Sequence, residues 1–223
     1  IVAGYPINGI WTKPITGWND KNGDGILTVD EVTIVSDTVY GAKDPVTGVR
    51  SVIGVGTFRG YAEPRYLTTL TAGIELFNHK LRIQNLLDWR GGNRYYNNTE
   101  RIRCTRPNCN GEFNPNASFQ EQAMVVAAIN APEKTLDGYM QPGAFVKWRE
   151  ATATLTLPDR LFSRVGGRSA SLVFAARNLR TWTNYRGSDP ESDYTATGGG
   201  DAPSEFQTFA APTLFQFRLN IGF

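Results

Sequence analysis

The chain has 223 residues, a formal net charge of +2 and a pI near 8.6. This near balance of charge argues against a nucleic-acid partner. Aromatic residues make up 12% of the chain and its mean hydropathy is -0.33, so we expect a folded protein that uses apolar residues sparingly. Its longest apolar run, at 123–129, is too short for a membrane-spanning helix. The strands of a membrane β-barrel, which alternate in polarity, remain possible on this composition.

The segment 20–31, DKNGDGILTVDE, matches the twelve-residue calcium-binding loop of EF-hand proteins. Gly25 at position six permits the sharp turn of such loops. Ligand positions one, three, five, seven, nine and twelve are Asp20, Asn22, Asp24, Ile26 (through its carbonyl), Thr28 and Glu31. Because the flanks do not read as helices, we expect a structural calcium ion that stiffens the loop. The alternative is an Asp/Asn/Gly turn without metal.

Alternation of apolar and polar residues predicts antiparallel strands along much of the chain. Residues 1–15 are a candidate strand. A hairpin with one apolar side is expected from 67–77 and 81–89, which a short turn at 78–80 connects. Further strands are expected at 144–158, 168–179 and 215–223. The predicted fold class is therefore all-β.

Two long polar stretches, 91–143 and 180–210, are rich in Gly, Pro, Asn and Ser. Compact soluble domains rarely contain structureless connections of that length. Short turns on one side and long extracellular loops on the other are typical of outer-membrane barrels, and one short loop helix is expected at 118–130. About six strands cannot close such a barrel, whose bacterial minimum is about eight, so other strands would have to complete the wall.

The two cysteines, Cys104 and Cys109, are close together in a polar segment. A disulfide that closes a small loop would fit an oxidising, extracytoplasmic compartment. The alternative is a pair of unbonded thiols in a surface loop. Without a nearby histidine, the two cysteines do not form a zinc site.

Residues suited to catalysis are few. The only histidine, His79, lies in the predicted turn, where a solvated side chain is expected. The clustered carboxylates Asp189, Glu191 and Asp193 lie in a loop whose spacing does not show two carboxylates facing each other across a bond. We therefore expect that the protein is not an enzyme.

Three tryptophans, Trp89, Trp148 and Trp182, lie near the ends of predicted strands. In a barrel they would form the aromatic belts at the membrane interfaces. In the alternative fold, a soluble β-sandwich, they would belong to the core between two sheets.

The segment 176–192, ARNLRTWTNYRGSDPES, resembles the C-terminal signature of the SusC/RagA class of TonB-dependent outer-membrane transporters. The segment 145–162 resembles the family's strand that ends in a Leu-Pro turn, and 60–77 its proline turn and following strand. The calcium-like loop lies where the family commonly has an Asn-Gly-Asp-Gly segment, whereas residues 1–50 match more loosely. The matching signature positions are Asn178, Leu179, Thr183, Tyr185, Gly187, Asp189, Pro190 and Glu191.

The resemblance implies that residues 1–223 are the C-terminal part of a barrel of about 22 strands in the bacterial outer membrane. The plug domain and the segment that binds TonB lie N-terminal in that family and are absent from this chain. The chain also begins without Met or a signal segment, as expected of a processed protein or part of a longer one. The implied function is energised import of glycans or peptides, with a SusD-like surface lipoprotein as a lid over the barrel.

The chain ends on a strand that alternates strictly in polarity. The apolar positions, which in a barrel would face outer-membrane lipid, are Phe215, Phe217, Leu219, Ile221 and Phe223. The terminal aromatic residue resembles the signal by which the barrel-assembly machinery recognises its clients. A second function stays open at this point: a secreted, non-catalytic β-sandwich that binds calcium and carbohydrate.

Overall fold

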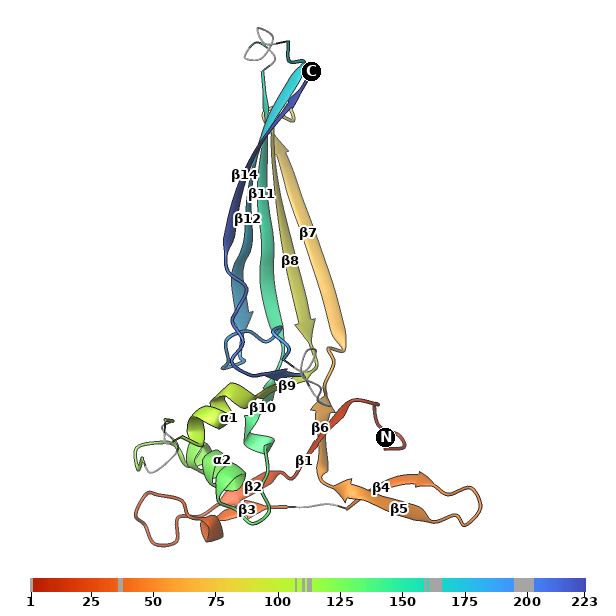
Figure 1. Ribbon diagram of the computed structural model, residues 1–223, viewed down its shortest axis with the longest axis vertical. Helices are drawn as coiled ribbons and strands as arrows, with labels where there is room; N and C mark the ends of the chain where they lie inside the picture. Colours follow the sequence, from red (N-terminus) through yellow and green to blue (C-terminus); the bar gives the residue numbers. More distant parts are fainter. Residues whose placement is uncertain are drawn as a thin grey trace. The chain divides into compact units, whose positions relative to one another are not determined.

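The computed structural model describes residues 2–35, 38–106, 108–109, 111, 114–158, 160, 166–194 and 203–223, and these form two compact units (Figure 1). The first, which we call the mixed unit, consists of Ile1–Arg65, Gly92–Gly143 and Tyr185–Phe209. The second, the sheet unit, consists of Tyr66–Gly91, Ala144–Asn184 and Ala210–Phe223.

The sheet unit is one antiparallel sheet in the order β14-β12-β11-β8-β7 (Figure 1). Its strands are β7 (Tyr66–Leu76), β8 (Leu81–Gly91), β11 (Phe145–Leu157), β12 (Ser169–Thr183) and β14 (Leu214–Gly222). All five strands predicted between residue 67 and the end of the chain are thereby confirmed. The turn between β7 and β8 is as short as expected, and it holds Phe77, Asn78 and His79 at positive φ. Most of the connection between β11 and β12, at 159–167, lies outside the described residues.

The five strands are not closed into a barrel. Within the described residues, β14 and β7 each pair with one neighbour in this sheet, so both are edge strands. Edge strands present unpaired backbone N–H and C=O groups. What the structure supports is therefore an all-β sheet, with its edges available for further strands.

The mixed unit contains short strands, which pair as β1-β6, β2-β3, β4-β5 and β10-β9-β13. Their bounds are β1 (Gly9–Thr12), β2 (Ile15–Trp18), β3 (Val32–Ile34), β4 (Thr38–Lys43), β5 (Arg50–Val55), β6 (Thr57–Tyr61), β9 (Arg94–Asn97), β10 (Met140–Pro142) and β13 (Ser204–Glu205). The candidate strand in residues 1–15 corresponds to β1 and the beginning of β2. The two long polar stretches, 91–143 and 180–210, are therefore largely folded into this unit and are not structureless connections, which corrects the prediction.

Helices fill part of this unit: α1 (Asn98–Cys104), α2 (Phe119–Ile129) and the one-turn 3-10 helices η1 (Val29–Glu31) and η2 (Asp137–Tyr139). The predicted helix is confirmed as α2, which Ser118 caps through a reciprocal contact with Glu121. The expectation of a single helix is wrong, because α1 also forms. It has only seven residues, too few for an apolar period, but Asn97 caps its first turn and Arg103 pairs with Glu100.

Two small apolar clusters form the core of the mixed unit. Leu27 packs with Ala123 and Val126 of α2. Cys104 packs with Val125 of α2 and Tyr139 of η2. Since α2 contributes to both clusters, it is the element around which the rest of the unit is organised. No helix in the described residues is long and apolar enough to cross a membrane.

Candidate functional site

The first candidate site is the apolar face of the five-stranded sheet. Residues that pair across the strands share a face, and the register aligns Ile74 with Ile83, Ile83 with Ala153, and Phe174 with Phe217. The aliphatic and phenylalanine positions on this face are Leu70, Ala72, Ile74, Leu76, Leu81, Ile83, Leu87, Val146, Ala151, Ala153, Leu155, Leu157, Ala170, Leu172, Phe174, Ala176, Phe215, Phe217, Leu219 and Ile221.

This face is exposed. Leu70 is 58% exposed, Ile74 55% and Phe217 67%. In a β-sandwich these side chains would be buried against a second sheet. Their exposure is opposite to that expectation and is typical of a surface that meets lipid or another protein.

An aromatic row crosses one end of the face, as predicted for Trp89 and Trp182. Both pair with Val146 of the central strand β11, so they lie in one row across three strands. Tyr66 stacks on Trp89 with 6.0 Å between the ring centroids. Trp148 lies two residues further along β11, and its indole N–H donates to Oδ1 of Asn85 at 3.2 Å. Such rows of Trp and Tyr form the girdles of outer-membrane barrels.

The opposite face of the sheet is mostly polar and carries ion pairs between strands. Nε of Arg177 lies 2.6 Å from Oε2 of Glu150, and Nε of Arg149 lies 3.1 Å from Oδ2 of Asp88. A hollow of about 160 Å³ is lined by Thr71, Gln84, Asn85, Leu86, Glu150 and Thr152. This sheet therefore has one apolar and one mostly polar face, the division that the alternation predicted.

The second candidate site is the calcium-like loop in the mixed unit. Its turn is built as expected, because Gly23 and Gly25 both have positive φ. Oδ1 and Oδ2 of Asp20 accept from the N–H groups of Gly23 and Gly25 at 2.8 and 2.9 Å. Asp24 Oδ1 accepts from Ile26 N–H at 2.7 Å, and its Oδ2 accepts from the Asn22 amide at 2.9 Å. The loop is thus closed by its own hydrogen bonds.

Glu31, the expected bidentate ligand, is buried and bonded to the loop backbone. Its Oε1 accepts from Lys21 N–H at 2.7 Å, and its Oε2 accepts from Thr28 N–H and Oγ1 at 2.8 and 2.7 Å. Among the described residues, no three His, Cys, Asp or Glu side chains are placed to hold a metal ion together. The three carboxylates of the pattern, Asp20, Asp24 and Glu31, are therefore not grouped around one point in this structure, and calcium binding stays a prediction.

These hydrogen bonds predict that the loop loosens in acid. The N–H and hydroxyl of Thr28, with Lys21 N–H, lower the pKa of Glu31 below its ordinary value of 4.5. The carboxylate therefore adds stability above that value, and this contribution is lost as the pH falls through the lower folded-state pKa. We expect Thr28 N–H to lose protection from hydrogen exchange as the pH falls from 6 to below 4, as measured by mass spectrometry with correction for intrinsic rates. In a Glu31→Gln variant the protection of Thr28 N–H should not depend on pH. An equal loss of protection in both proteins would contradict the assignment of this effect to Glu31.

Gln122, in α2, holds the loop in place and was not predicted from the sequence. Its Oε1 accepts from Leu27 N–H at 2.7 Å, and its Nε2 donates to the Gly25 carbonyl at 2.8 Å. The same Nε2 lies 3.4 and 3.2 Å from the carbonyls of Asn114 and Ala117. The side chain is fully buried. A polar residue inside an apolar helix pattern was the only signal in the sequence that could have revealed it.

The signature 178–191 is divided between the two units. Asn178, at positive φ, and Leu179 belong to β12 of the sheet unit. Asn178 binds the segment before β14, since its Nδ2 donates to Pro212 O and its carbonyl accepts from Thr213 Oγ1. Gly187, Asp189, Pro190 and Glu191 belong to the mixed unit. Each unit therefore uses its own part of the signature.

In the mixed unit the signature surrounds Glu205, a carboxylate that sequence reasoning missed. Oε2 of the buried Glu205 accepts from Tyr185 Oη at 2.8 Å and from Ser188 N–H at 2.9 Å. The ring of Tyr185 meets that of Tyr95 edge-on at 5.2 Å, and Tyr95 Oη donates to the Ser192 carbonyl. Burial and the neighbouring carboxylates raise the pKa of both tyrosines. In this unit the signature residues therefore form a packed structural cluster, which we call the Glu205 cluster.

Asp189 also stabilises the Glu205 cluster through hydrogen bonds. Its Oδ1 accepts from Glu191 N–H at 2.9 Å, and its carbonyl accepts from Ser192 N–H and Oγ. These are turn contacts of the kind that aspartate commonly makes. Pro190 is buried beside it.

The structure joins Cys104 to Cys109 in a disulfide, with 4.9 Å between their Cα atoms. The bond attaches the C-terminus of α1 to the following segment. Cys104 is buried against Val125 and Tyr139. The disulfide therefore closes a small loop, which is the pairing that the spacing suggested.

The terminal strand is exposed along its whole length. Its five apolar residues, Phe215, Phe217, Leu219, Ile221 and Phe223, range from 38% to 78% exposed. Among the described strands of its sheet, β14 pairs with β12 alone. Recognition of this strand by the barrel-assembly machinery stays a prediction.

Comparison with solved structures finds chains of similar fold. The chain is similar to a structure of the RagAB peptide importer in the 'open-open' state, with a TM-score of 0.62 and 18% identity over 99% of this chain and 23% of that chain. It is also similar to the 'closed-closed' state (TM-score 0.57, 17% identity, 95% and 22% covered) and to a structure of the RagAB peptide transporter (0.60, 16%, 96% and 22%). The chain spans less than a quarter of each matched chain. At these identities the likeness shows the fold alone.

No protein-family model and no curated protein matches the sequence. The fold, and not the sequence, therefore connects this chain to those structures.

Proposed function

We propose that this chain is part of a SusC/RagA-type, TonB-dependent transporter of the bacterial outer membrane, which imports peptides or glycans. The five-stranded sheet would form barrel wall, and the mixed unit would belong to the extracellular loops. A SusD-like lipoprotein and TonB would bind the complete transporter. The observation that carries the proposal is the exposed apolar face of the sheet, with an aromatic row across one end.

The dimensions of the sheet support this role. β7 has 11 residues, so it is about 36 Å long at about 3.3 Å per residue. Tilted by about 45°, it would rise about 26 Å, which is close to the apolar band of about 25 Å in outer-membrane barrels. The ion-paired polar face suits a water-filled lumen.

The open edges give further support. Unpaired backbone groups in hydrocarbon cost several kcal/mol each, so β7 and β14 would need neighbouring strands in a membrane. The matched structures, described as a peptide importer, are more than four times as long as this chain, which agrees with further strands. Among the two substrate classes, that likeness favours peptides.

A pair of neighbouring substitutions in the central strand β8 tests membrane contact. Ile83 lies on the apolar face and Gln84 on the polar face. We expect Ile83→Arg to destabilise the protein folded in phosphatidylcholine vesicles by about 1–3 kcal/mol, because it would place a charge inside the apolar band, between its middle and its edge. Gln84→Arg should change the stability by less than about 1 kcal/mol. Urea titration followed by tryptophan fluorescence measures both values.

Two outcomes would contradict the proposal. One is an equal effect of the two substitutions in vesicles. The other is a chain that is monomeric and cooperatively folded in water without detergent, since a lipid-facing sheet should aggregate there.

A structural calcium ion in loop 20–31 is the second part of the proposal. Its support is the ligand pattern and the positive φ of Gly25. Binding would require Glu31 to exchange its backbone partners for the ion. Calorimetric titration of the chelator-treated protein should show binding at millimolar calcium or tighter, and Asp20→Asn should weaken it at least about tenfold. A lack of heat in that range would remove calcium from the proposal.

A further inference from the structure

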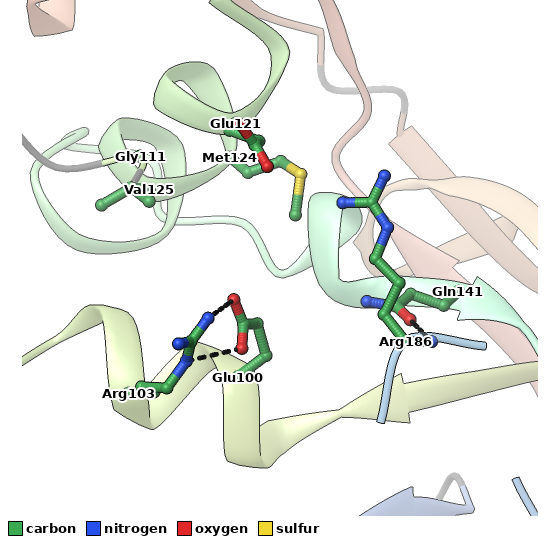
Figure 2. Close-up of a pocket in the computed structure, with 8 residues that line it drawn as sticks. All are labelled: Glu100, Arg103, Gly111, Glu121, Met124, Val125, Gln141 and Arg186. Carbon is green, nitrogen blue, oxygen red and sulfur yellow. Dashed lines mark hydrogen bonds and ion pairs between the residues drawn. The ribbon is translucent and has the colours of Figure 1, made fainter. Parts of the chain in front are cut away.

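A pocket of about 220 Å³ lies in the mixed unit (Figure 2). One of its lining residues, Arg186, lies between Tyr185 and Gly187 of the signature segment. Its lining comes from α1, α2, β10 and the segment after β12. The eight lining residues are Glu100, Arg103, Gly111, Glu121, Met124, Val125, Gln141 and Arg186. Its volume is suited to a ligand about the size of one amino acid.

Two donor groups in this pocket have no partner in the described part of the chain. Oε1 of Gln141 accepts from Arg186 N–H at 2.9 Å, which leaves the Nε2 amide group without a protein acceptor among the described residues. Gln141 is 8% exposed, and Figure 2 shows its amide nitrogen directed into the pocket. The guanidinium of Arg186 likewise has no ion-pair partner among the described residues. The Gln141 amide nitrogen is not one of the buried side-chain atoms that lack a partner, and Arg186 is exposed, so solvent reaches both donors and a ligand oxygen in the pocket would take the place of water.

The other charged pair in the lining is already satisfied. Nη2 and Nε of Arg103 lie 2.7 and 2.8 Å from the two carboxylate oxygens of Glu100 (Figure 2). Glu121 caps α2 through one oxygen, Oε2, which accepts from Ser118 Oγ at 3.1 Å. This leaves one positive group, Arg186, and one negative group, Glu121, for a ligand. Figure 2 shows the apolar side chain of Met124 between them.

We propose that this pocket binds the α-carboxylate of an apolar amino acid, either free or at the end of a short peptide. The carboxylate accepts from the guanidinium of Arg186 and the amide of Gln141, as planar guanidinium groups bind carboxylates well. The apolar side chain packs on Met124, and an α-ammonium group faces Glu121. This site is independent of membrane insertion, because it uses the mixed unit alone.

Other small ligands fit the lining less well. A phosphate carries about two negative charges at neutral pH and would meet the carboxylates of Glu100 and Glu121. A sugar commonly stacks on aromatic rings, and the eight lining residues include none. A ligand with one negative and one positive charge matches the balanced lining.

Calorimetry of the complete protein in detergent tests the site with three probes: L-leucine, the dipeptide Ala-Leu and L-leucinamide. We expect saturable binding of leucine, Ala-Leu or both, and at least tenfold weaker binding of leucinamide, which lacks the carboxylate. Tighter binding of leucine than of Ala-Leu would indicate a free amino acid as the source of the carboxylate. Tighter binding of Ala-Leu would indicate a peptide. Equal binding of leucinamide, or no binding of leucine and Ala-Leu tighter than about 10 mM, overturns the proposal.

Three variants assign the binding to these residues. Arg186→Gln removes the exposed guanidinium, and Gln141→Glu removes the free amide donor but keeps an oxygen to accept from Arg186 N–H. Each should weaken binding at least tenfold. Arg106→Gln, an exposed position outside the lining with the same change of charge, is the matched control and should bind normally. Normal binding by both pocket variants, or equal weakening in the control, overturns the proposal.

Discussion

Replacement of Gln122 with leucine is expected to lower the free energy of unfolding of the mixed unit by about 2–4 kcal/mol. The substitution keeps the size and helix propensity of the side chain but removes its amide. Leu27 N–H, which is buried, and the Gly25 carbonyl would lose their partners. A buried donor or acceptor without a partner costs about 1–3 kcal/mol.

Urea unfolding and hydrogen exchange at Leu27 N–H measure this effect. Gln120→Leu is the matched control, because Gln120 is an exposed residue of the same helix. Its effect should stay within about 0.5 kcal/mol. Equal stability of the two variants would show that Gln122 does not hold the calcium-like loop on α2.

The Gly187→Ala substitution is expected to destabilise the same unit by about 3–5 kcal/mol. A Cβ at this position would collide with Oε2 of Glu205 and with the ring of Tyr185. The carboxylate of Glu205 would then move away from Tyr185 Oη and Ser188 N–H while it stays buried. This packing explains on physical grounds why the signature has glycine at position 187.

Near-UV circular dichroism of the tyrosines and urea unfolding measure the loss. Gly17→Ala, in β2, serves as the control, because a Cβ there has no described atom within 4 Å. The control should change the stability by less than about 1 kcal/mol. An unaltered tyrosine signal in the Gly187→Ala variant would contradict the described packing.

Local patterns predicted the sheet well. In β7, β8 and β14 apolar residues recur mainly at every second position, with Asn85 and Leu86 of β8 as exceptions, and this period of two is sufficient to place each strand and to divide most of its faces. α2 was predicted for a similar reason, since Ser118 and Glu121 have the spacing of a capping box. α1 was missed because its seven residues span about two turns.

In the calcium-like loop, one sequence pattern is compatible with two different local structures. Thr28 and Glu31 are positions nine and twelve of a calcium loop, but they also have the spacing of a helix cap. In the structure Glu31 bonds the N–H and hydroxyl of Thr28, as a cap does. The sequence alone does not distinguish a calcium-binding loop from a helix cap here, because both need the same residue types at the same spacing.

The pairs that hold the mixed unit together are distant in the sequence. Gln122 and Leu27 are 95 positions apart, and Asp137 bonds Thr12, 125 positions away, at 2.6 Å. A polar residue carries no local signal of a partner so remote, so the two polar stretches were taken for loops. The pocket with Gln141 and Arg186 was missed for the same reason.

The sequence by itself determined the strands of the sheet, their apolar and polar faces, and the capped helix α2, because each depends on neighbours within a few residues. Only the tertiary structure decided that 92–143 and 185–209 fold with the first 65 residues, that Glu31 caps a turn, and that Gln141 and Arg186 line one pocket. Those features depend on hydrogen bonds and packing between residues that the chain brings together only when folded.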